Sequence, residues 1–240
     1  DLSASLNATA TLSKEVDPTV VCRRERTRCR AYFYRGDYAA SMRALQFARQ
    51  AAIESGSSLL RAQIGLTDLT LSSAAQSLEA TSSALTDLKR LVAHTGEPHL
   101  MVELRLCVAR AEARSNSLRE AEKHVATAEA LLERYPNLWL SGALELDRAI
   151  IKTLNGDIES ALHHLQIASD YADQSGHFRT KAAALINSAQ LLSDHGEAKK
   201  AQALFETAIK QAQHHPQLLV AALDGQANFF LNRGEHDRAI

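Results

Sequence analysis

The sequence predicts an all-α fold, a right-handed α-α superhelix in which helical hairpins stack in sequence order. The first observation is composition: the 240 residues include 10 Gly and 4 Pro and are only 5% aromatic. Such a composition favours helices over the many turns of β-sandwiches and barrels. The second observation is a turn motif that recurs about every 40 residues and is followed each time by an amphipathic segment. Recurrence at such a period is typical of repeat arrays.

The repeat is clearest at its turns, where a glycine is followed by an acidic residue. These pairs are Gly36-Asp37, Gly156-Asp157, Gly196-Glu197 and Gly234-Glu235. A small residue follows five positions after each glycine, and two weaker members fill the gap in the middle of the chain. The small residues are Ser41, Ala80, Ala121, Ala161, Ala201 and Ala239, at spacings of 39, 41, 40, 40 and 38 residues.

Each small residue begins a stripe along a helix. Four and seven residues after it stand Leu45 and Ala48, Ala84 and Asp87, Val125 and Ala128, Leu165 and Ala168, and Phe205 and Ala208. Offsets of zero, four and seven lie on one helical face, where small residues let a neighbouring helix approach closely. Asp87 breaks the column. The preceding helices carry matching apolar stripes, which include Ile64 and Leu71, then Leu185, Ala189 and Leu192, then Leu223, Ala227 and Phe230.

Capping and breaking residues set the predicted helix ends. Asp17-Pro18 is an N-cap followed by proline in the first helical position, and Gly56, Gly96, Pro136 and Gly176 mark breaks. The predicted helices span 18–34, 37–54, 57–72, 75–94, 98–114, 117–134, 138–154, 157–174, 178–194, 197–214 and 217–232.

These helices group into one repeat array over residues 1–240. We expect a half-unit at 1–16, five units at 17–56, 57–96, 97–136, 137–176 and 177–216, and a partial unit at 217–240. Leu2, Leu6 and Ala8 would form the apolar stripe of the half-unit. Half a hairpin cannot bury its own apolar face, so we expect the chain to be a fragment of a longer protein.

With its small residue before the turn, its Gly-Asp or Gly-Glu at the turn, and its small, bulky, small series after it, the sequence resembles the tetratricopeptide repeat (TPR) family. The resemblance covers essentially the whole chain, although the period of about 40 exceeds the common 34 and implies longer helices. Long repeats are similar to those of maltose-regulator-like transcription activators, Rap-type peptide-sensing phosphatases and Pins-type polarity scaffolds. The resemblance implies a protein-binding or sensing module.

Several function classes are not favoured. The formal net charge is -1, so no global field favours nucleic acid or a membrane surface. No phosphate-binding loop, nucleophile elbow or dinucleotide fingerprint occurs, and we expect no enzyme activity and no cofactor. Adjacent histidines such as His163 and His164 point about 100° apart on a helix and cannot share one metal ion. Cys22 and Cys29 are predicted to be reduced, buried thiols, consistent with a cytoplasmic setting.

One local feature departs from the average. Five arginines stand within eight residues: Arg23, Arg24, Arg26, Arg28 and Arg30. If Cys22 and Cys29 face the core, a neighbouring stripe carries Arg23, Arg26, Arg30, Phe33 and Tyr34. In the TPR family this stripe lines a concave groove, and Arg26 and Arg30 fall where some members bind a peptide carboxylate, although that clamp's asparagines are absent here. Farther along, the stripe gives Leu69, Arg110, Gln190, Asp224 and Asn228.

The sequence therefore predicts a protein or peptide partner, acidic where it meets the arginines. A solvated arginine face that only covers apolar surface is the simpler interpretation of the same residues. Two other functions stay open. One is a sugar or metabolite sensor of a transcription activator, for which Phe33, Tyr34, Phe229 and Trp139 would supply aromatic platforms. The other is a structural spacer that self-associates through its ends.

Overall fold

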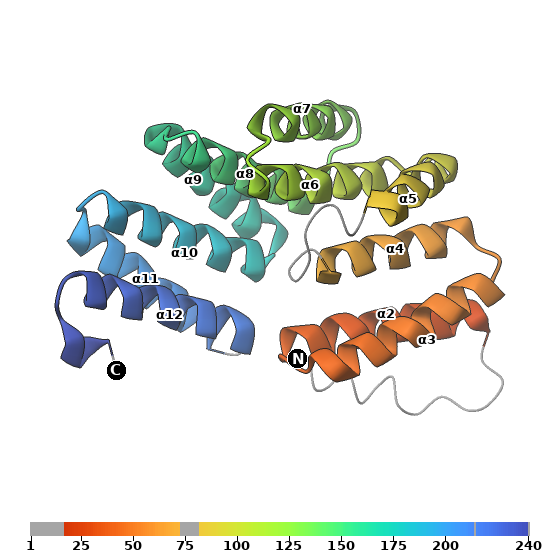
Figure 1. The fold of residues 1–240 in the computed structure, drawn as a ribbon, viewed down its shortest axis with the longest axis horizontal. Helices are drawn as coiled ribbons and strands as arrows, with labels where there is room; N and C mark the ends of the chain where they lie inside the picture. Colours follow the sequence, from red (N-terminus) through yellow and green to blue (C-terminus); the bar gives the residue numbers. More distant parts are fainter. Residues whose placement is uncertain (1–16, 73–81, 214, 240) are drawn as a thin grey trace. The chain divides into compact units, whose positions relative to one another are not determined.

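The computed structural model describes residues 17–72, 82–213 and 215–239. All regular secondary structure in these ranges is helical (Figure 1). The elements are α2 (Pro18–Tyr34), α3 (Tyr38–Glu54), α4 (Ser58–Ser72), α5 (Ser82–Thr95), α6 (Pro98–Arg114), α7 (Leu118–Arg134), α8 (Leu138–Leu154), α9 (Ile158–Ser175), α10 (Phe178–Asp194), α11 (Ala198–Ala212), α12 (Pro216–Asn232) and the 3-10 helix η2 (His236–Arg238). Every predicted helix end that falls in the described ranges is confirmed to within two residues.

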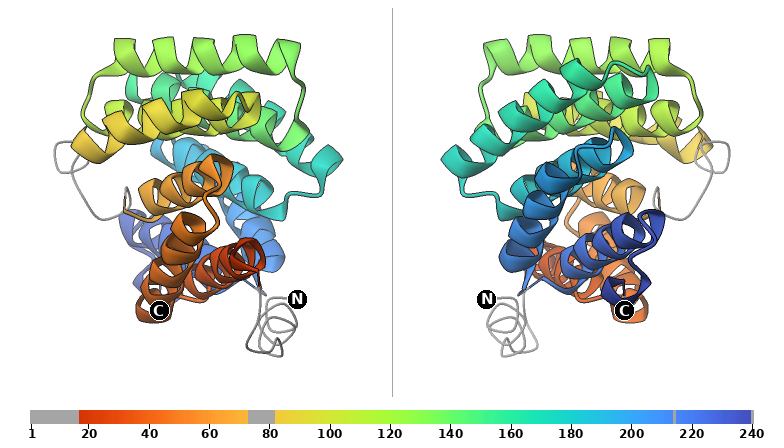
Figure 2. Two further views of the ribbon diagram at one scale, coloured as in Figure 1. Left: turned by 90° about the vertical axis from the view of Figure 1, so that its right-hand side faces the viewer. Right: turned by 90° about the vertical axis from the view of Figure 1, so that its left-hand side faces the viewer.

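The chain divides into two compact units, Asp1–Cys107 and Val108–Ile240, with the boundary inside α6. In the first unit α4 lies between the α2–α3 hairpin and α5 (Figures 1 and 2). In the second unit α7 to α12 pack in sequence order, each helix against the next. The first helices of successive hairpins also touch, as α2 does α4 and α10 does α12. The half-unit 1–16 and the anchor Ala80 lie outside the described residues, and the unit boundaries stay predictions.

The turns inside the hairpins follow from residues that tolerate a left-handed backbone. Gly36, Gly156 and Gly196 have φ of 79°, 76° and 80°, a region that L side chains avoid. Asn116 takes the equivalent place with φ 60°, because asparagine is among the few other residues that adopt it at low cost. The residue after Gly36 and Gly156 is an aspartate that caps the next helix: Asp37 accepts from Ala40 N at 2.9 Å and Asp157 from Ser160 N at 3.2 Å.

The core follows the predicted stripes, with one change of register. Ala48, Ala128, Ala168 and Ala208 are all 0% exposed. Asp87 was expected in the same column, but it is exposed and pairs with Arg90 on the helix surface. Leu88, 7% exposed, takes its place. The buried column therefore falls at 48, 88, 128, 168 and 208, a regular period of 40 residues, because a carboxylate remains in water when the next residue can pack instead.

The last described hairpin departs from the prediction in a similar way. Leu223 was expected on the core face of α12, but it is 45% exposed. Ala222 and Phe229 are buried instead, whereas Phe230 is buried as predicted, and the rings of Phe229 and Phe230 pack with Phe205 from α11. Phe205 is larger than the leucine or valine at the equivalent position of other units, and the opposing helix carries Gly225 against its ring, where a Cβ would lie 2.7 Å from Phe205 Cε1.

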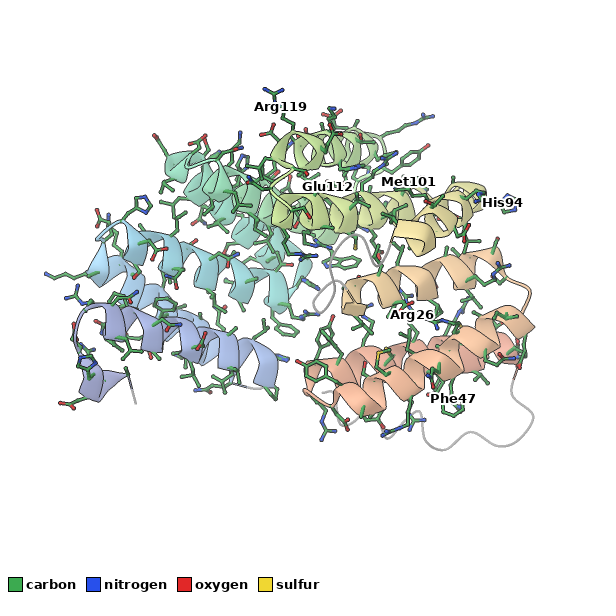
Figure 3. All side chains as sticks on the ribbon, viewed as in Figure 1. Arg26, Phe47, His94, Met101, Glu112 and Arg119 are labelled. Atoms are coloured by element: carbon green, nitrogen blue, oxygen red, sulfur yellow. The ribbon has the colours of Figure 1, made fainter. Side chains whose placement is uncertain are left out.

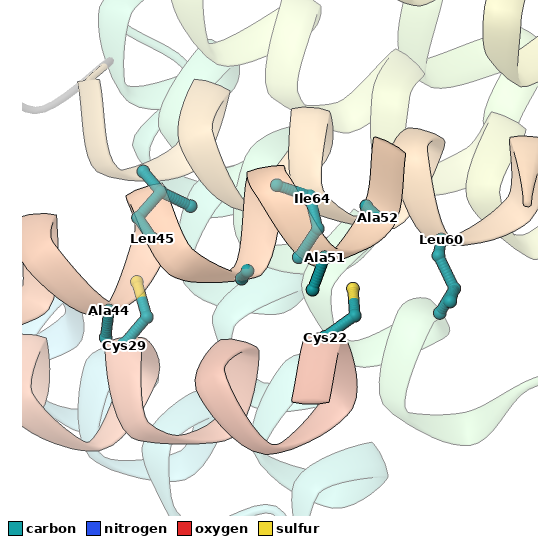
Figure 4. Packing of buried hydrophobic residues seen from close by; sticks show 9 residues of the cluster. Cys22, Cys29, Ala44, Leu45, Ala51, Ala52, Leu60 and Ile64 are labelled. Atoms are coloured by element: carbon teal, nitrogen blue, oxygen red, sulfur yellow. The ribbon is translucent and has the colours of Figure 1, made fainter. Parts of the chain in front are cut away.

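The two cysteines of α2 lie in the core, as predicted. Cys22 and Cys29 are both 0% exposed and pack with Ala44, Leu45 and Ile64 (Figure 4). Burial raises the pKa of both thiols, so the thiolate needed for redox or metal chemistry is disfavoured. Ser41 Oγ donates to the Cys29 carbonyl oxygen at 2.9 Å, which satisfies the hydroxyl where the other units have alanine.

Within the described ranges, no helix combines the length and the apolar character that a membrane crossing requires.

We expect Phe205→Ala to lower the free energy of unfolding by about 3–5 kcal/mol, because it empties a fully buried site between two helices. Phe47→Ala is the matched control: Phe47 is 65% exposed, and its removal should change stability by less than about 0.5 kcal/mol. Urea unfolding followed by circular dichroism measures both. Equal effects of the two substitutions would contradict the assignment of Phe205 to the core.

Candidate functional site

The residues predicted to line a groove fall in both units. Arg23, Arg26, Arg30, Phe33 and Tyr34 all belong to α2 in the first unit. The second unit holds Arg110 on α6, Gln190 on α10, and Asp224 and Asn228 on α12. The five residues of the first unit lie together on α2, whereas those of the second unit lie on three different helices.

Arg26 is anchored between helices rather than open to solvent. Its Nε donates to Thr67 Oγ1 of α4 at 3.1 Å, and Thr67 in turn donates to the Gln63 carbonyl oxygen at 2.9 Å. Figure 3 shows Arg26 between α2 and α4. Burial lowers the pKa of its guanidinium, Arg30 lowers it further, and Glu103 of α6 opposes both.

The positive charges of Arg23 and Arg30 are not balanced by a nearby carboxylate among the described residues, whereas Glu103 acts on Arg26. Arg23 is exposed and Arg30 half-buried, and neither makes an ion pair with any carboxylate in the described part of the chain. Arg30 is close enough to Arg26 to lower its pKa, so the two like charges repel. A negative group placed between Arg23 and Arg30 would relieve this repulsion, and their planar guanidinium groups suit a carboxylate.

The aromatic pair lies at the C-terminal end of the same helix. The rings of Phe33 and Tyr34 meet edge-on with centroids 5.6 Å apart, and Phe33 makes a second edge contact, also 5.6 Å, with Tyr38 of α3. Phe33 and Tyr34 are half-buried. They provide an apolar surface beside the arginines. The contact between Phe33 and Tyr38 of α3 fixes the position of this surface.

In the second unit Arg110 binds a carboxylate of the chain itself. Its Nη1 donates to Asp147 Oδ1 at 3.1 Å and to Oδ2 at 2.9 Å. Asp147 lies on α8 with its side chain 3% exposed, and burial raises its pKa to about 6 in spite of Arg110. Asp147 was not anticipated from the sequence, because a buried acid inside an apolar helix has no local signal. Arg110 thus carries a charge already neutralised by the fold.

The other predicted positions of the second unit are polar; Asp224 and Asn228 are exposed and Gln190 is half-buried. Gln190 Nε2 donates to Asp194 at 2.8 Å along α10. Asn228 Nδ2 donates to Asp224 Oδ2 at 3.4 Å along α12. These bonds link residues four apart on one exposed helix face and leave acceptor and donor capacity toward solvent.

A second polar cluster, on α7, α8 and α9, was not predicted from the sequence. Arg148 of α8 pairs with Glu129 of α7 and, at 3.0 Å, with Glu145 of its own helix. His164 Nδ1 of α9 lies 2.6 Å from the other oxygen of Glu145. The Glu145–Arg148 spacing of three residues was visible in the sequence, but the pairing across three helices was not.

The aromatic candidates for a sugar site do not all remain. Phe229 was expected in the groove, but it is 2% exposed and packs in the core with Phe205 and Phe230. Trp139 is half-buried and lies 5.6 Å from the His177 ring, between centroids. Phe33 and Tyr34 belong to the first unit, so Trp139 is the candidate that remains in the second unit, where one ring gives a sugar little surface to stack on.

The described residues contain no group of three His, Cys, Asp or Glu side chains arranged to hold a metal ion. The polar and aromatic groups described above, which are guanidinium groups, amides and ring edges, are presented from helices.

The fold is similar to that of solved TPR proteins. A Rap protein complexed with competence and sporulation factor has a TM-score of 0.74 at 11% identity, over 99% of this chain and 76% of that one. A STAND protein with a tetratricopeptide repeat sensor, from Pyrococcus horikoshii, has a TM-score of 0.60 at 14% identity, over 89% of this chain and 35% of that one. The predicted class, an α-α solenoid of TPR-like hairpins, is confirmed. No protein-family model and no curated protein sequence matches the chain.

We expect Arg26→Ala to lower the free energy of unfolding by about 1 kcal/mol, because it removes a side chain that links α2 to α4. Arg30→Ala, on the same helix but without an ion pair, should change stability by less than about 0.5 kcal/mol. Thermal melts of both variants test this. A neutral Arg26→Ala would contradict the anchoring role.

The buried Asp147 should make stability depend on pH. Its folded pKa of about 6 is above the ordinary value of 3.8, so the folded state binds the proton more tightly between these values. This stabilisation is present at low pH and is lost as pH rises through 6. The unfolding free energy of the native chain relative to Asp147→Asn should therefore fall between pH 4 and 7, by on the order of 1–3 kcal/mol. A rise over the same range would mean that Arg110 outweighs burial.

Proposed function

We propose that this chain is a non-catalytic binding module of a larger signalling or transcription-regulatory protein, which binds an acidic peptide or a neighbouring domain through α2. The observation that carries the proposal is the pair Arg23 and Arg30, two cations that no described carboxylate neutralises, beside the anchored Arg26. Arg26 holds the stripe in place, and Arg23 and Arg30 bind the partner.

The chemistry favours an acidic segment over other ligands. A carboxylate accepts two parallel hydrogen bonds from one guanidinium, so a row of arginines on a rigid helix reads the spacing of acidic side chains. Phe33 and Tyr34 extend the same surface with aromatic edges, which contribute binding area at low entropic cost. The proposed contact therefore combines charge with a short apolar anchor.

The solved structures of similar fold support a binding or sensing role. One is described as complexed with competence and sporulation factor, and the other as having a tetratricopeptide repeat sensor. A fold of this kind offers helix faces rather than an enclosed, dry pocket, which favours recognition over catalysis.

The polar positions of the second unit belong to the proposal as well. Gln190, Asp224 and Asn228 would contribute hydrogen bonds to a partner, whereas Arg110 would contribute little because Asp147 neutralises it. A sugar or metabolite sensor is less favoured, since Phe229 is in the core.

Reversing the charge of Arg23 and Arg30 together tests the proposal. A fluorescein-labelled hexaglutamate peptide should bind the chain at low salt, and the double variant Arg23→Glu, Arg30→Glu should weaken this binding about tenfold or more, which is 1.4 kcal/mol. Fluorescence polarisation measures the Kd, and the melting temperature should stay nearly unchanged. Arg26 is left intact, because its loss would alter packing.

The matched control is Arg119→Glu with Arg134→Glu, a reversal of two exposed arginines on α7. It changes the net charge equally and should leave the affinity within about twofold. Equal weakening by the two double variants would show that total charge, not α2, attracts the peptide, and would contradict the proposal.

A further inference from the structure

A second surface lies on the α2–α3 hairpin, distinct from the arginine stripe that binds in the proposed function. It is a hollow of about 360 Å³ whose described lining comes only from these two helices. We call it the α2/α3 face and define it by Val21, Arg24, Arg28, Tyr32, Arg43 and Phe47. Figure 3 shows Phe47 on the side of α3 away from α4. The face is therefore not the one on which the next hairpin stacks.

The chain contains a second copy of this arrangement. The repeat of 40 residues places the α8–α9 hairpin 120 residues after α2–α3, so that Glu25 corresponds to Glu145 and Arg28 to Arg148. Both glutamates are buried, at 5% and 8% exposure. Both pair with the arginine three residues later, at 3.3 Å in α2 and 3.0 Å in α8. The two hairpins thus carry the same buried acid and the same partly covered arginine.

In the second unit a helix, α7, packs on the corresponding face of the α8–α9 hairpin. Glu129 of α7 binds Arg148, and Glu122 of α7 lies 3.8 Å from Lys152. Val125 and Ala126 of α7 line a hollow together with Arg148, Lys152 and His164. Those last three residues correspond to Arg28, Tyr32 and Ala44, which line the α2/α3 face. With α7 in place the hollow measures about 180 Å³, half the volume found on α2–α3.

The α2/α3 face retains the chemistry for such a helix but is not satisfied by the described residues. Arg148 divides its guanidinium between two carboxylates, whereas Arg28 reaches Glu25 and, at 3.4 Å, the Tyr32 hydroxyl. The buried Nε of Arg28 has no acceptor among the described residues. Phe47 is 65% exposed, while its counterpart Ile167 is half-buried.

Charge completes the comparison. The α2/α3 face carries three guanidinium groups, from Arg24, Arg28 and Arg43, against the one carboxylate of Glu25. The corresponding hollow on α8–α9 has three carboxylates, Glu145, Glu129 and Glu122, around Arg148 and Lys152, and two of the three come from α7. The α2/α3 face lacks acidic residues of the kind that α7 supplies.

We propose that the α2/α3 face is a docking site for an amphipathic helix of a partner protein, seated as α7 is seated on α8–α9, with a stripe of small apolar residues and an acidic residue that binds Arg28. The small residues follow the pattern of α7, which lines the hollow on α8–α9 with Val125 and Ala126 and whose buried stripe of Ala121, Val125 and Ala128 is 0%, 3% and 0% exposed. The acid takes the place of Glu129, and an apolar side chain covers Phe47.

The probe is a labelled peptide of residues 117–135 of this chain, since α7 carries the required chemistry. We expect it to bind the full chain with a Kd on the order of 10–100 μM by fluorescence polarisation. Phe47→Ser should raise the Kd at least about fivefold. Met42→Ser, which removes another exposed apolar side chain of α3 outside the face, should leave it within about twofold.

A charge exchange identifies the contact. The peptide with Glu129→Lys should bind the native chain at least about fivefold more weakly than the unchanged peptide does. Its affinity should be restored when the chain carries Arg28→Glu. Arg30→Glu, on the arginine stripe of α2, should not restore it, which separates this site from the proposed function. Melting curves show whether Arg28→Glu folds, and Phe47→Ser keeps the test valid if it does not.

Four outcomes would overturn the proposal. The first is that the peptide does not bind the chain, and the second is that it binds with a Kd that Phe47→Ser leaves unchanged. A third is self-association of the chain in sedimentation that Phe47→Ser abolishes, which would make a second copy the occupant. The last is displacement of the probe by a peptide of residues 1–16, which would assign the face to this chain's own segment.

Discussion

The structure depends on how closely helices approach through one column of small residues. Ala48, Ala128, Ala168 and Ala208 are completely buried, and a larger side chain at these places would separate the helices that pack there. Where the column contains Leu88, or where Phe205 stands three residues before Ala208, the opposing helix provides glycine: Gly65 faces Leu88 and Gly225 faces Phe205. At these two contacts the missing side chain of the glycine leaves room for the larger residue.

This close packing determines which polar residues can serve recognition. Side chains that extend over a neighbouring helix become part of the scaffold, as Arg26 does through Thr67 and Arg110 does through Asp147. Side chains one turn away stay open, as Arg23 does. The proposed binding stripe is therefore a scaffold arginine, Arg26, between the exposed Arg23 and the half-buried Arg30, and its geometry is set by helix packing rather than by a loop.

Much of this could be read from the sequence, because the signals are local or periodic. Gly36, Gly156 and Asp37 determine turns and caps by backbone preference alone, and the alanine column sets the face of each second helix. The sequence showed a break at Asp87 without identifying the residue that fills it, and the place of Leu223 was predicted wrongly. At both positions a neighbouring residue, Leu88 or Ala222, could equally fill the core, and only the opposing helix decides between them.

By itself the sequence determined the helices, their ends, the period of 40 and the burial of Cys22 and Cys29, since each follows from residues close together in the chain. Only the tertiary structure decided which charges are neutralised. Asp147 lies 37 residues from Arg110, and Glu129 lies 19 residues from Arg148. Ion pairs between helices depend on distances in space, which no spacing along the chain encodes.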